Sequence, residues 1–149
     1  ILQALEKARE IDPRILIEEG LEVREIECGI IGKSKLLTSE IGEVKYESDW
    51  YDYDSKYYSN NQITIPAEID SKITKEIKEI AIQSCRALNI FGFARVDFFL
   101  EKSSNKILLN EINTIPGFTK NSMFPMLWKA SGLNIEQLVA KLVDISLDL

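Results

Sequence analysis

The alternation of hydrophobic and polar side chains is clearest in residues 94–119, and the rest of the chain is organised around this stretch. Residues 95–100 and 106–113 form two runs that predict β-strands, and the polar residues 101–105 between them predict a tight turn. A Pro-Gly turn follows at residues 116–117. We therefore expect an antiparallel β-hairpin at the centre of the fold.

The hairpin register that best separates polar from apolar side chains pairs position 102 with position 106. Strand side chains alternate between the two faces of a sheet, so residues directly opposite each other share a face. One face would then carry Arg95 opposite Asn113 and Asp97 opposite Glu111. The other would carry apolar side chains and one polar misfit: Val96, Phe98, Leu108, Ile112 and Asn110. A slip of one residue would destroy this partition.

The polar face of the predicted hairpin combines two carboxylates, one amide oxygen and one guanidinium. Hard oxygen ligands this close together suit Mg²⁺, which usually keeps positions for water and substrate phosphates. Two neighbouring carboxylates also repel each other unless a cation lies between them. The alternative is a solvated sheet face with an Arg95–Asp97 ion pair. The spacing alone leaves both interpretations open.

The remaining pattern predicts an α+β fold, in which a mostly antiparallel sheet is flanked by helices. We expect further strands over residues 14–19, 23–32, 35–38 and 43–46, with Glu25 opposite the apolar face of its strand. Helical spacing predicts helices over residues 2–11 and 71–88, the second capped by Asp70 or Ser71.

Two more helices are expected near the C-terminus. Residues 122–131 predict a short helix that Pro125 interrupts. Asn134 and Gln137 have the spacing of a capping box at the start of a last helix. The expected buried stripe of this helix is Ile135, Leu138, Val139, Leu142, Ile145 and Leu149.

Residues 47–62 differ from the rest of the chain. They place one Trp and four Tyr among Asp, Ser and Asn, with a single lysine, Lys56. This composition is too polar for a core and too aromatic for a plain linker. A binding loop or lid is the functional interpretation, and a surface hairpin with exposed tyrosines is the alternative.

Composition narrows the possible functions. The 149 residues fit one domain or a lobe of a larger protein, and the net charge of -6 argues against a general nucleic-acid binder. No run of about 18 apolar residues predicts a membrane span. The chain has no histidine, which excludes His-based triads, His metal sites and His acid–base catalysis.

Two further features concern the setting of the chain. Cys28 and Cys85 are far apart and belong to no metal-binding motif, which favours a reducing, cytoplasmic setting, with Cys85 as a small core residue. The sequence begins inside a helical pattern and without Met. We therefore expect the protein to start upstream of Ile1.

Longer sequence motifs resemble those of a known protein family. The segments RVDFFL, LNEINTIPGFT and SMFPMLW resemble the C-terminal signature of D-alanine–D-alanine ligases, members of the ATP-grasp superfamily. ILIEEGLEVREIECGIIG and WYDYDSKYYS resemble two earlier blocks of that family, in the expected order. The resemblance extends over essentially the whole chain.

The resemblance implies an ATP-grasp C-terminal lobe and a cytoplasmic enzyme that joins two D-alanine molecules for peptidoglycan. ATP phosphorylates the carboxylate of one D-alanine, and the amine of the second attacks the acyl phosphate. The expected cofactors are ATP and Mg²⁺ or Mn²⁺, as two ions. The expected assembly is a homodimer of the full-length protein, without nucleic-acid or membrane partners.

Individual roles follow from motif positions. The implied metal ligands are Asp97, Glu111 and Asn113. Arg95 matches the family arginine that contacts substrate, and the Gly117 N–H matches an oxyanion-hole donor. Ser122 and the Met123 backbone match the site for the second D-alanine. The implied nucleotide-binding residues are Glu18, Glu19, Gly20, Leu21, Glu25, Trp50 and Asn113. Lys56 and Tyr57 match loop residues that contact the phosphoryl group and cover the second substrate.

The resemblance also defines what we expect to be missing and which alternatives stay open. Residues 1–149 would be a partial ATP-grasp domain, inactive alone, with the first-substrate domain and the first half of the ATP-binding domain upstream. A D-alanine–D-serine ligase and a non-catalytic ATP- and Mg²⁺-binding lobe are the alternatives. A lactate-using ligase would place a histidine at Tyr57, and the motifs argue against another ATP-grasp carboxylate–amine ligase.

Overall fold

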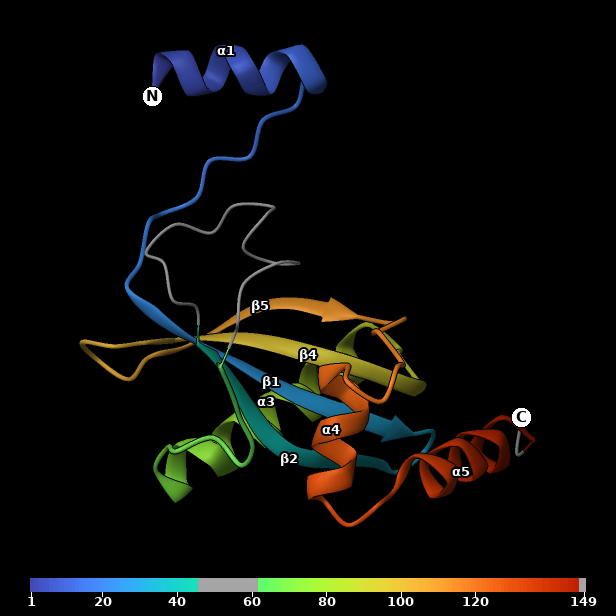
Figure 1. The fold of residues 1–149 in the computed structure, drawn as a ribbon. Coiled ribbons are helices and arrows are strands. Elements are labelled where there is room, and N and C mark those ends of the chain that lie inside the picture. The colour runs from blue at the N-terminus through green and yellow to red at the C-terminus, as the bar shows by residue number, and fades with distance from the viewer. Residues whose placement is uncertain (46–61, 148–149) are drawn as a thin grey trace.

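The computed structural model describes residues 1–45 and 62–147 of the protein (Figure 1). Five antiparallel strands form one sheet in the order β3-β2-β1-β4-β5. Their bounds are β1 (Val23–Gly32), β2 (Leu36–Lys45), β3 (Gln62–Thr64), β4 (Gly92–Glu101) and β5 (Ile107–Asn113). The helices are α1 (Leu2–Ile11), α3 (Ser71–Ala87), α4 (Met123–Ala130) and α5 (Ile135–Leu147). The predicted α+β class with a mostly antiparallel sheet is confirmed.

Helix α1 stands apart from the sheet, joined to β1 by an extended segment (Figure 1). The strand predicted over residues 14–19 is wrong, because that segment has no regular secondary structure. Its apolar side chains, Leu16 and Ile17, are 80% and 73% exposed. An apolar run becomes a strand only when a neighbouring strand completes its hydrogen bonds.

The two short strands predicted over residues 35–38 and 43–46 form one continuous strand, β2, as far as Lys45. The register between β1 and β2 shifts between Cys28 and Ile30. Close to this bulge the Gly29 N–H donates to Ser39 Oγ at 2.8 Å. A bulge lets a single strand change which of its residues face the core. This change of alternation within β2 made the sequence pattern resemble two separate strands.

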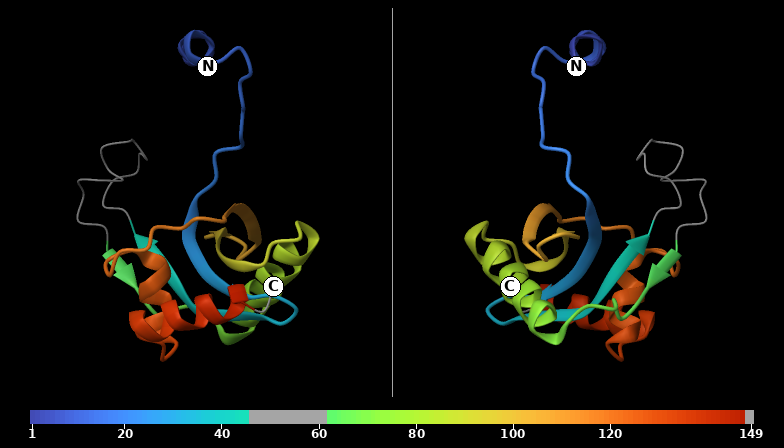
Figure 2. Two further views of the ribbon diagram at one scale, coloured as in Figure 1. Left: turned by 90° about the vertical axis from the view of Figure 1, so that its right-hand side faces the viewer. Right: turned by 90° about the vertical axis from the view of Figure 1, so that its left-hand side faces the viewer.

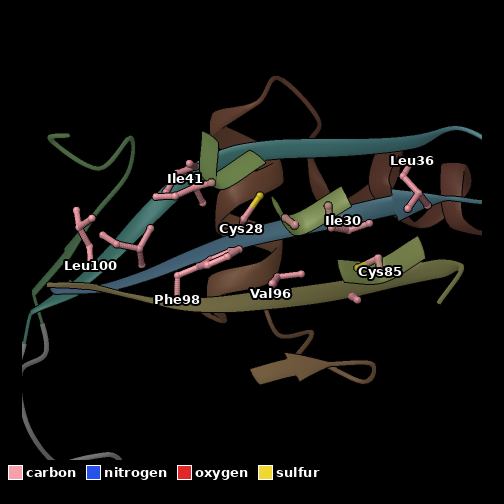
Figure 3. Packing of buried hydrophobic residues seen from close by; sticks show 12 residues of the cluster. Cys28, Ile30, Leu36, Ile41, Cys85, Val96, Phe98 and Leu100 are labelled. Atoms are coloured by element: carbon pink, nitrogen blue, oxygen red, sulfur yellow. The ribbon is translucent and has the colours of Figure 1, made fainter. Parts of the chain in front are cut away.

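One face of the sheet is covered by α3 and forms the main hydrophobic core (Figures 2 and 3). β1 and β4 alternate so that Ile26, Cys28, Val96 and Phe98 all point to this face. The predicted helix over residues 71–88 is confirmed as α3, and Asp70 caps it by accepting a hydrogen bond from the Lys72 N–H at 2.7 Å. The remaining fully buried members of this core are Ile30, Ile41, Ile77, Ala81, Cys85, Ala94 and Leu100.

The opposite face is covered by α4 and α5 over only part of its length (Figure 2). There Ile31 packs with Phe124, Trp128 and Leu138. Gly29 permits the close approach of α4, since a Cβ at this position would lie 2.8 Å from Trp128 Nε1. The part of this face that α4 and α5 leave uncovered contains a cleft.

Two details of the C-terminal helices differ from expectation. Pro125 does not interrupt α4, because it lies in the first turn, where no helical N–H bond is required. The predicted capping box at α5 is confirmed by reciprocal bonds between Asn134 and Gln137. In the predicted stripe of α5, however, Val139 is largely exposed and only Leu138 is fully buried. Leu149 lies outside the described residues.

No helix among the described residues is long and apolar enough to span a bilayer.

Candidate ligand cleft on the sheet

The hairpin register is as predicted where the polar residues lie. Arg95 pairs with Asn113, and Asp97 pairs with Glu111. The register then shifts by one residue, so that Phe98 pairs with Leu109. Asn110 is thus the extra residue of a β-bulge, which explains why it did not fit the alternation.

The same shift corrects one predicted core residue. Because Phe99 pairs with Leu108, Leu108 lies on the face of β5 that carries Glu111, rather than beside Phe98 on the core face. Ile107, opposite Leu100, packs against the core instead, together with Ile112. A bulge exchanges the two faces of a strand beyond the point at which it occurs.

Alternate residues of β1, β4 and β5 line a cleft of about 410 Å³ on the face opposite α3. The register places Glu27 of β1 directly opposite Asp97 of β4, which in turn pairs with Glu111 of β5. Three carboxylates from three adjacent strands therefore lie in one row across the sheet. The cleft is also lined by Glu19, Leu21, Val23, Glu25, Arg95, Phe99 and Asn110, and by Ile26 and Phe98, whose side chains belong to the core on the other face.

Arg95 is the cation within this group of acids. Its Nε–H and Nη2–H donate to the two carboxylate oxygens of Asp97, each at 2.7 Å. Nε also lies 3.0 Å from Oε2 of Glu27. The single Nε–H is directed at Asp97, so that Glu27 Oε2 accepts no hydrogen bond from any described residue.

The cleft carries an excess of negative charge, and Glu27 responds most strongly. Burial raises the pKa of Glu27 to about 8; Arg95 opposes this shift, while Asp97, Glu25 and Glu111 add to it. Burial alone would lower the pKa of Arg95, but its bonds to Asp97 and the charges around it raise that pKa instead. One guanidinium thus balances several carboxylates incompletely.

This chemistry fits a divalent cation, although the described residues do not form a finished metal site. Across the described ranges, no three acidic, His or Cys side chains adopt a metal-binding arrangement. In the structure Arg95 donates to both oxygens of Asp97, and the Asn113 amide donates to Glu111 at 2.9 Å. A cation would supply the missing positive charge among hard oxygen donors.

The predicted nucleotide residues are divided by the structure. Glu19, Leu21 and Glu25 line the cleft, whereas Glu18 and Gly20 do not. Asn113 lies next to the cleft through its bond to Glu111. The segment before β1 therefore approaches the same cavity as the predicted metal ligands.

The predicted second-substrate residues form a separate cluster at the start of α4. Ser122 Oγ accepts from the Thr119 N–H at 3.1 Å and lies 2.9 Å from Thr119 Oγ1. A Cβ on Gly117 would lie 3.0 Å from Ser122 Oγ, so glycine permits this tight turn. Met123 is buried beneath it. Gly117 and Ser122 do not line the cleft among the described residues.

Three predicted site residues lie outside the described residues: Trp50, Lys56 and Tyr57.

Sequence reasoning missed Glu27 as a residue of the site. The signal was present in the alternation of β1, where Glu25 and Glu27 share one face and Ile26 and Cys28 share the other. What the pattern could not reveal was the pairing of β1 with β4, which brings Glu27 to Asp97 and Arg95.

Comparison with known proteins agrees with this architecture. D-alanine–D-alanine ligases of Prochlorococcus marinus strains MIT 9215 and NATL2A are 92% and 50% identical to this chain over 149 and 146 residues, which are 100% and 97% of it. The chain covers 42% of each of these relatives, less than half of their length.

Solved structures give the same result. The D-alanine–D-alanine ligase from Coxiella burnetii is 35% identical, with a TM-score of 0.83. The match covers 99% of this chain and 38% of the ligase chain. The VanG D-Ala:D-Ser ligase from Enterococcus faecalis is 37% identical, with a TM-score of 0.76. The match covers 86% of this chain and 37% of the ligase chain. The family described as "D-ala D-ala ligase C-terminus" matches residues 1–144. The chain belongs to this family of D-Ala-D-Ala ligase C-terminal domains.

Proposed function

We propose that the chain supplies the cation- and nucleotide-binding part of an enzyme that joins two D-alanine molecules at the expense of ATP, for peptidoglycan synthesis. The observation that carries the proposal is the row of facing carboxylates, Glu27, Asp97 and Glu111, with Arg95 beside them in the cleft. Family membership supports the reaction class. The high identity to relatives named D-alanine–D-alanine ligase favours D-alanine over D-serine as the second substrate.

Asp97, Glu111 and Asn113 would hold the divalent cations, two ions of Mg²⁺ or Mn²⁺. Such ions neutralise the phosphates of ATP and the charge on the transferred phosphoryl group. Arg95 takes one lone pair on each oxygen of Asp97, and its positive charge would weaken cation binding at the remaining lone pairs. We therefore expect Arg95 to give up part of this contact when a cation binds.

Arg95 would then bind the reacting carboxylate or phosphate. A guanidinium has five N–H groups in a planar fork, and two of them are used by Asp97. Gly117 would donate its backbone N–H to the oxygen on which negative charge develops, where the lack of a side chain permits close approach. Ser122 and the Met123 backbone would bind the carboxylate of the second D-alanine.

Glu25 would bind the ribose hydroxyls from the cleft wall, and Glu18 with the segment 19–21 would bind the adenine. Trp50 would lie near the adenine. Lys56 and Tyr57 would contact the phosphoryl group and cover the second substrate, excluding water from an acyl phosphate that water would hydrolyse.

We also propose the domain organisation, localisation and oligomeric state of the whole enzyme. The 149 residues would form part of an ATP-grasp domain in a cytoplasmic, homodimeric enzyme, and they would be inactive alone, since they cover 42% of the relatives' length. A robust rate of dipeptide formation by this chain alone would contradict that proposal. Light scattering of the full-length protein would test the dimer.

The function is tested in a full-length protein that carries these 149 residues; the MIT 9215 relative with this segment exchanged supplies one. With ATP, Mg²⁺ and D-alanine we expect equimolar ADP, phosphate and D-alanyl-D-alanine. Glu111→Gln should lower kcat/KM by on the order of 10³-fold. Competition between D-alanine, D-serine and D-lactate identifies the second substrate, and preferred use of D-serine would contradict the proposal. Unchanged turnover in Glu111→Gln would overturn the metal assignment and favour a different role for the cleft.

A further inference from the structure

Arg95 contacts two carboxylates that lie opposite each other on neighbouring strands. The bond to Asp97 is bidentate, with both N–O distances at 2.7 Å. The contact with Glu27 is a single approach of 3.0 Å from Nε to Oε2, without a directed hydrogen bond. Arg95 is therefore held mainly by Asp97, and Glu27 is a second, incompletely used partner.

Arg95 and a divalent cation compete for Asp97, because the guanidinium takes one lone pair on each oxygen and its positive charge repels a cation at the others. Glu111, the next carboxylate in the row, is a proposed ligand of the same cation. Glu27 is the remaining carboxylate of the row, and it has no ligand role in the proposed function. Its side chain is 13% exposed, so its position is fixed by the surrounding strands rather than by solvent.

We propose that Glu27 is a positioning residue for Arg95: it keeps the guanidinium in the cleft when a divalent cation takes the carboxylate of Asp97. The inference rests on the proposed function of the cleft. In the cation-free state Arg95 neutralises Asp97. In the cation-bound state the guanidinium rotates its N–H groups onto Glu27 and remains beside the substrate.

The exchange requires only a small movement, since Nε already lies 3.0 Å from Oε2 of Glu27. It also uses an acceptor that is buried and lacks a hydrogen bond, and such a group gains free energy when a donor turns toward it. Without the charge of Glu27, Arg95 would lose the anion that already lies 3.0 Å from its Nε, and it would compete with the cation for Asp97.

The first test measures Mn²⁺ binding by electron paramagnetic resonance in the full-length protein, with a non-hydrolysable ATP analogue present. The measurement is made at pH 9, above the raised pKa of about 8, so that Glu27 is ionised; Glu27→Gln then keeps the size of the side chain and removes its charge. We expect Mn²⁺ to bind about tenfold more weakly, within the range of coupling found for residues in one ion-pair network. The Mn²⁺ concentration for half-maximal rate should rise in parallel.

A double-mutant cycle separates positioning from simple attraction between Glu27 and the cation. In an Arg95→Met background, Glu27→Gln should change Mn²⁺ affinity by less than about twofold, because the group that it positions is gone. A tenfold loss in both backgrounds would overturn the inference and assign Glu27 a direct electrostatic effect on the cation.

Glu43→Gln is the matched control. Glu43 is also a buried carboxylate in an ion pair, with Arg24 at 2.7 and 2.8 Å, but it lies on the α3 face. Its substitution should leave Mn²⁺ affinity within about twofold of the unsubstituted protein, since the interaction of distant sites is small. A tenfold loss here would show that any buried charge has this effect, and would overturn the specific role of Glu27.

A crystal structure of the unsubstituted protein with Mn²⁺ and the ATP analogue needs no variant to fold. We expect Asp97 on the cation and an Arg95 nitrogen within about 3.2 Å of Glu27, an ordinary hydrogen-bond distance. A guanidinium that leaves Glu27, or that remains bidentate on Asp97, would overturn the inference. Failure of the proposed function is a separate result, namely no dipeptide formation by the unsubstituted protein.

Discussion

The two faces of the sheet are built from the same strands, and they perform opposite tasks. On β1 and β4, the α3 face presents Ile26, Cys28, Val96 and Phe98, all buried in an apolar core. The other face presents acids and Arg95, exposed to a cleft. The difference is achieved by strand alternation alone, because neighbouring residues point to opposite sides of a sheet.

Two buried carboxylates show how differently these faces treat charge. Glu43 lies on the α3 side, opposite Ile26, and burial would raise its pKa, but the bidentate bond from Arg24 lowers that pKa instead. Glu27 lies on the cleft side, shares Arg95 with Asp97, and has a pKa raised to about 8 by burial. Charge is fully paired where it supports the fold and underpaired where we propose that a cation binds.

The largest effect is expected for Glu111→Gln, which should separate the activity of the cleft face from the stability of the core face. Glu111 is exposed, so the free energy of unfolding should change by less than about 0.5 kcal/mol. If Glu111 is the metal ligand that we propose, its loss should lower kcat/KM by on the order of 10³-fold, equivalent to about 4 kcal/mol. Steady-state ADP release and urea unfolding measure the two quantities, and a large loss of stability with activity retained would break the contrast.

Phe98→Ala is the reciprocal change on the other face. Phe98 is fully buried between the sheet and α3, and its truncation should cost about 3–5 kcal/mol of unfolding free energy through lost burial and a residual cavity. At a temperature where the variant stays folded, its Mn²⁺ affinity should be that of the unsubstituted protein. Chemical denaturation gives the stability, and a specific loss of Mn²⁺ binding would contradict the separation of the faces.

The third prediction concerns pH. Because the folded-state pKa of Glu27 is raised, its contribution favours folding below the unfolded pKa of about 4.5 and is lost as the pH rises toward about 8. Without cations, Glu27→Gln should remove this decline and stabilise the protein at pH 8–9 by on the order of a few kcal/mol. Thermal unfolding in EDTA across this range measures the effect.

Glu43→Gln is the control for the pH prediction, and its effect on the free energy of unfolding should have the opposite sign. Its pKa is lowered, so its contribution is present above the unfolded pKa and is lost as the pH falls through the folded value. Glu43→Gln should therefore destabilise the protein at neutral pH and show a smaller loss on acidification. Stabilisation at pH 8 by both substitutions would remove the distinction between the two carboxylates.

The smallest effect is expected where α4 closes the apolar end of the cleft face. A Cβ on Gly29 would lie 2.8 Å from the Trp128 side chain and 3.1 Å from Ser39 Oγ. Gly29→Ala should therefore cost about 1–3 kcal/mol through overpacking. Calorimetry measures the loss; an unchanged melting temperature would show that α4 can move away freely.

The hairpin illustrates what could be predicted from the sequence. Its polar end was predicted in the correct register because Arg95, Asp97, Glu111 and Asn113 identify one face. The bulge was not predicted, since inserting one residue changes no composition; the misfit of Asn110 was its only trace. Local alternation therefore predicts which face a side chain occupies until the strand becomes irregular.

Long-range pairing accounts for the rest. The role of Glu27 depends on β1 lying beside β4, and no pattern within β1 contains that information. The strand predicted at residues 14–19 failed for a related reason: Leu16 and Ile17 have the composition of a strand, but no strand of residues 1–45 or 62–147 pairs with them. Roles that came from the family resemblance, such as those of Gly117 and Ser122, could not have been obtained from spacing.

The central claim is that the acidic face of the sheet binds a divalent cation between β4 and β5. Crystals of the full-length protein grown with Mn²⁺ and a non-hydrolysable ATP analogue would test it through the anomalous scattering of manganese. We predict a peak about 2.0–2.3 Å from carboxylate oxygens of both Asp97 and Glu111, a usual distance for such ions. A bound nucleotide with no peak between these two carboxylates, or with manganese elsewhere, would contradict the account.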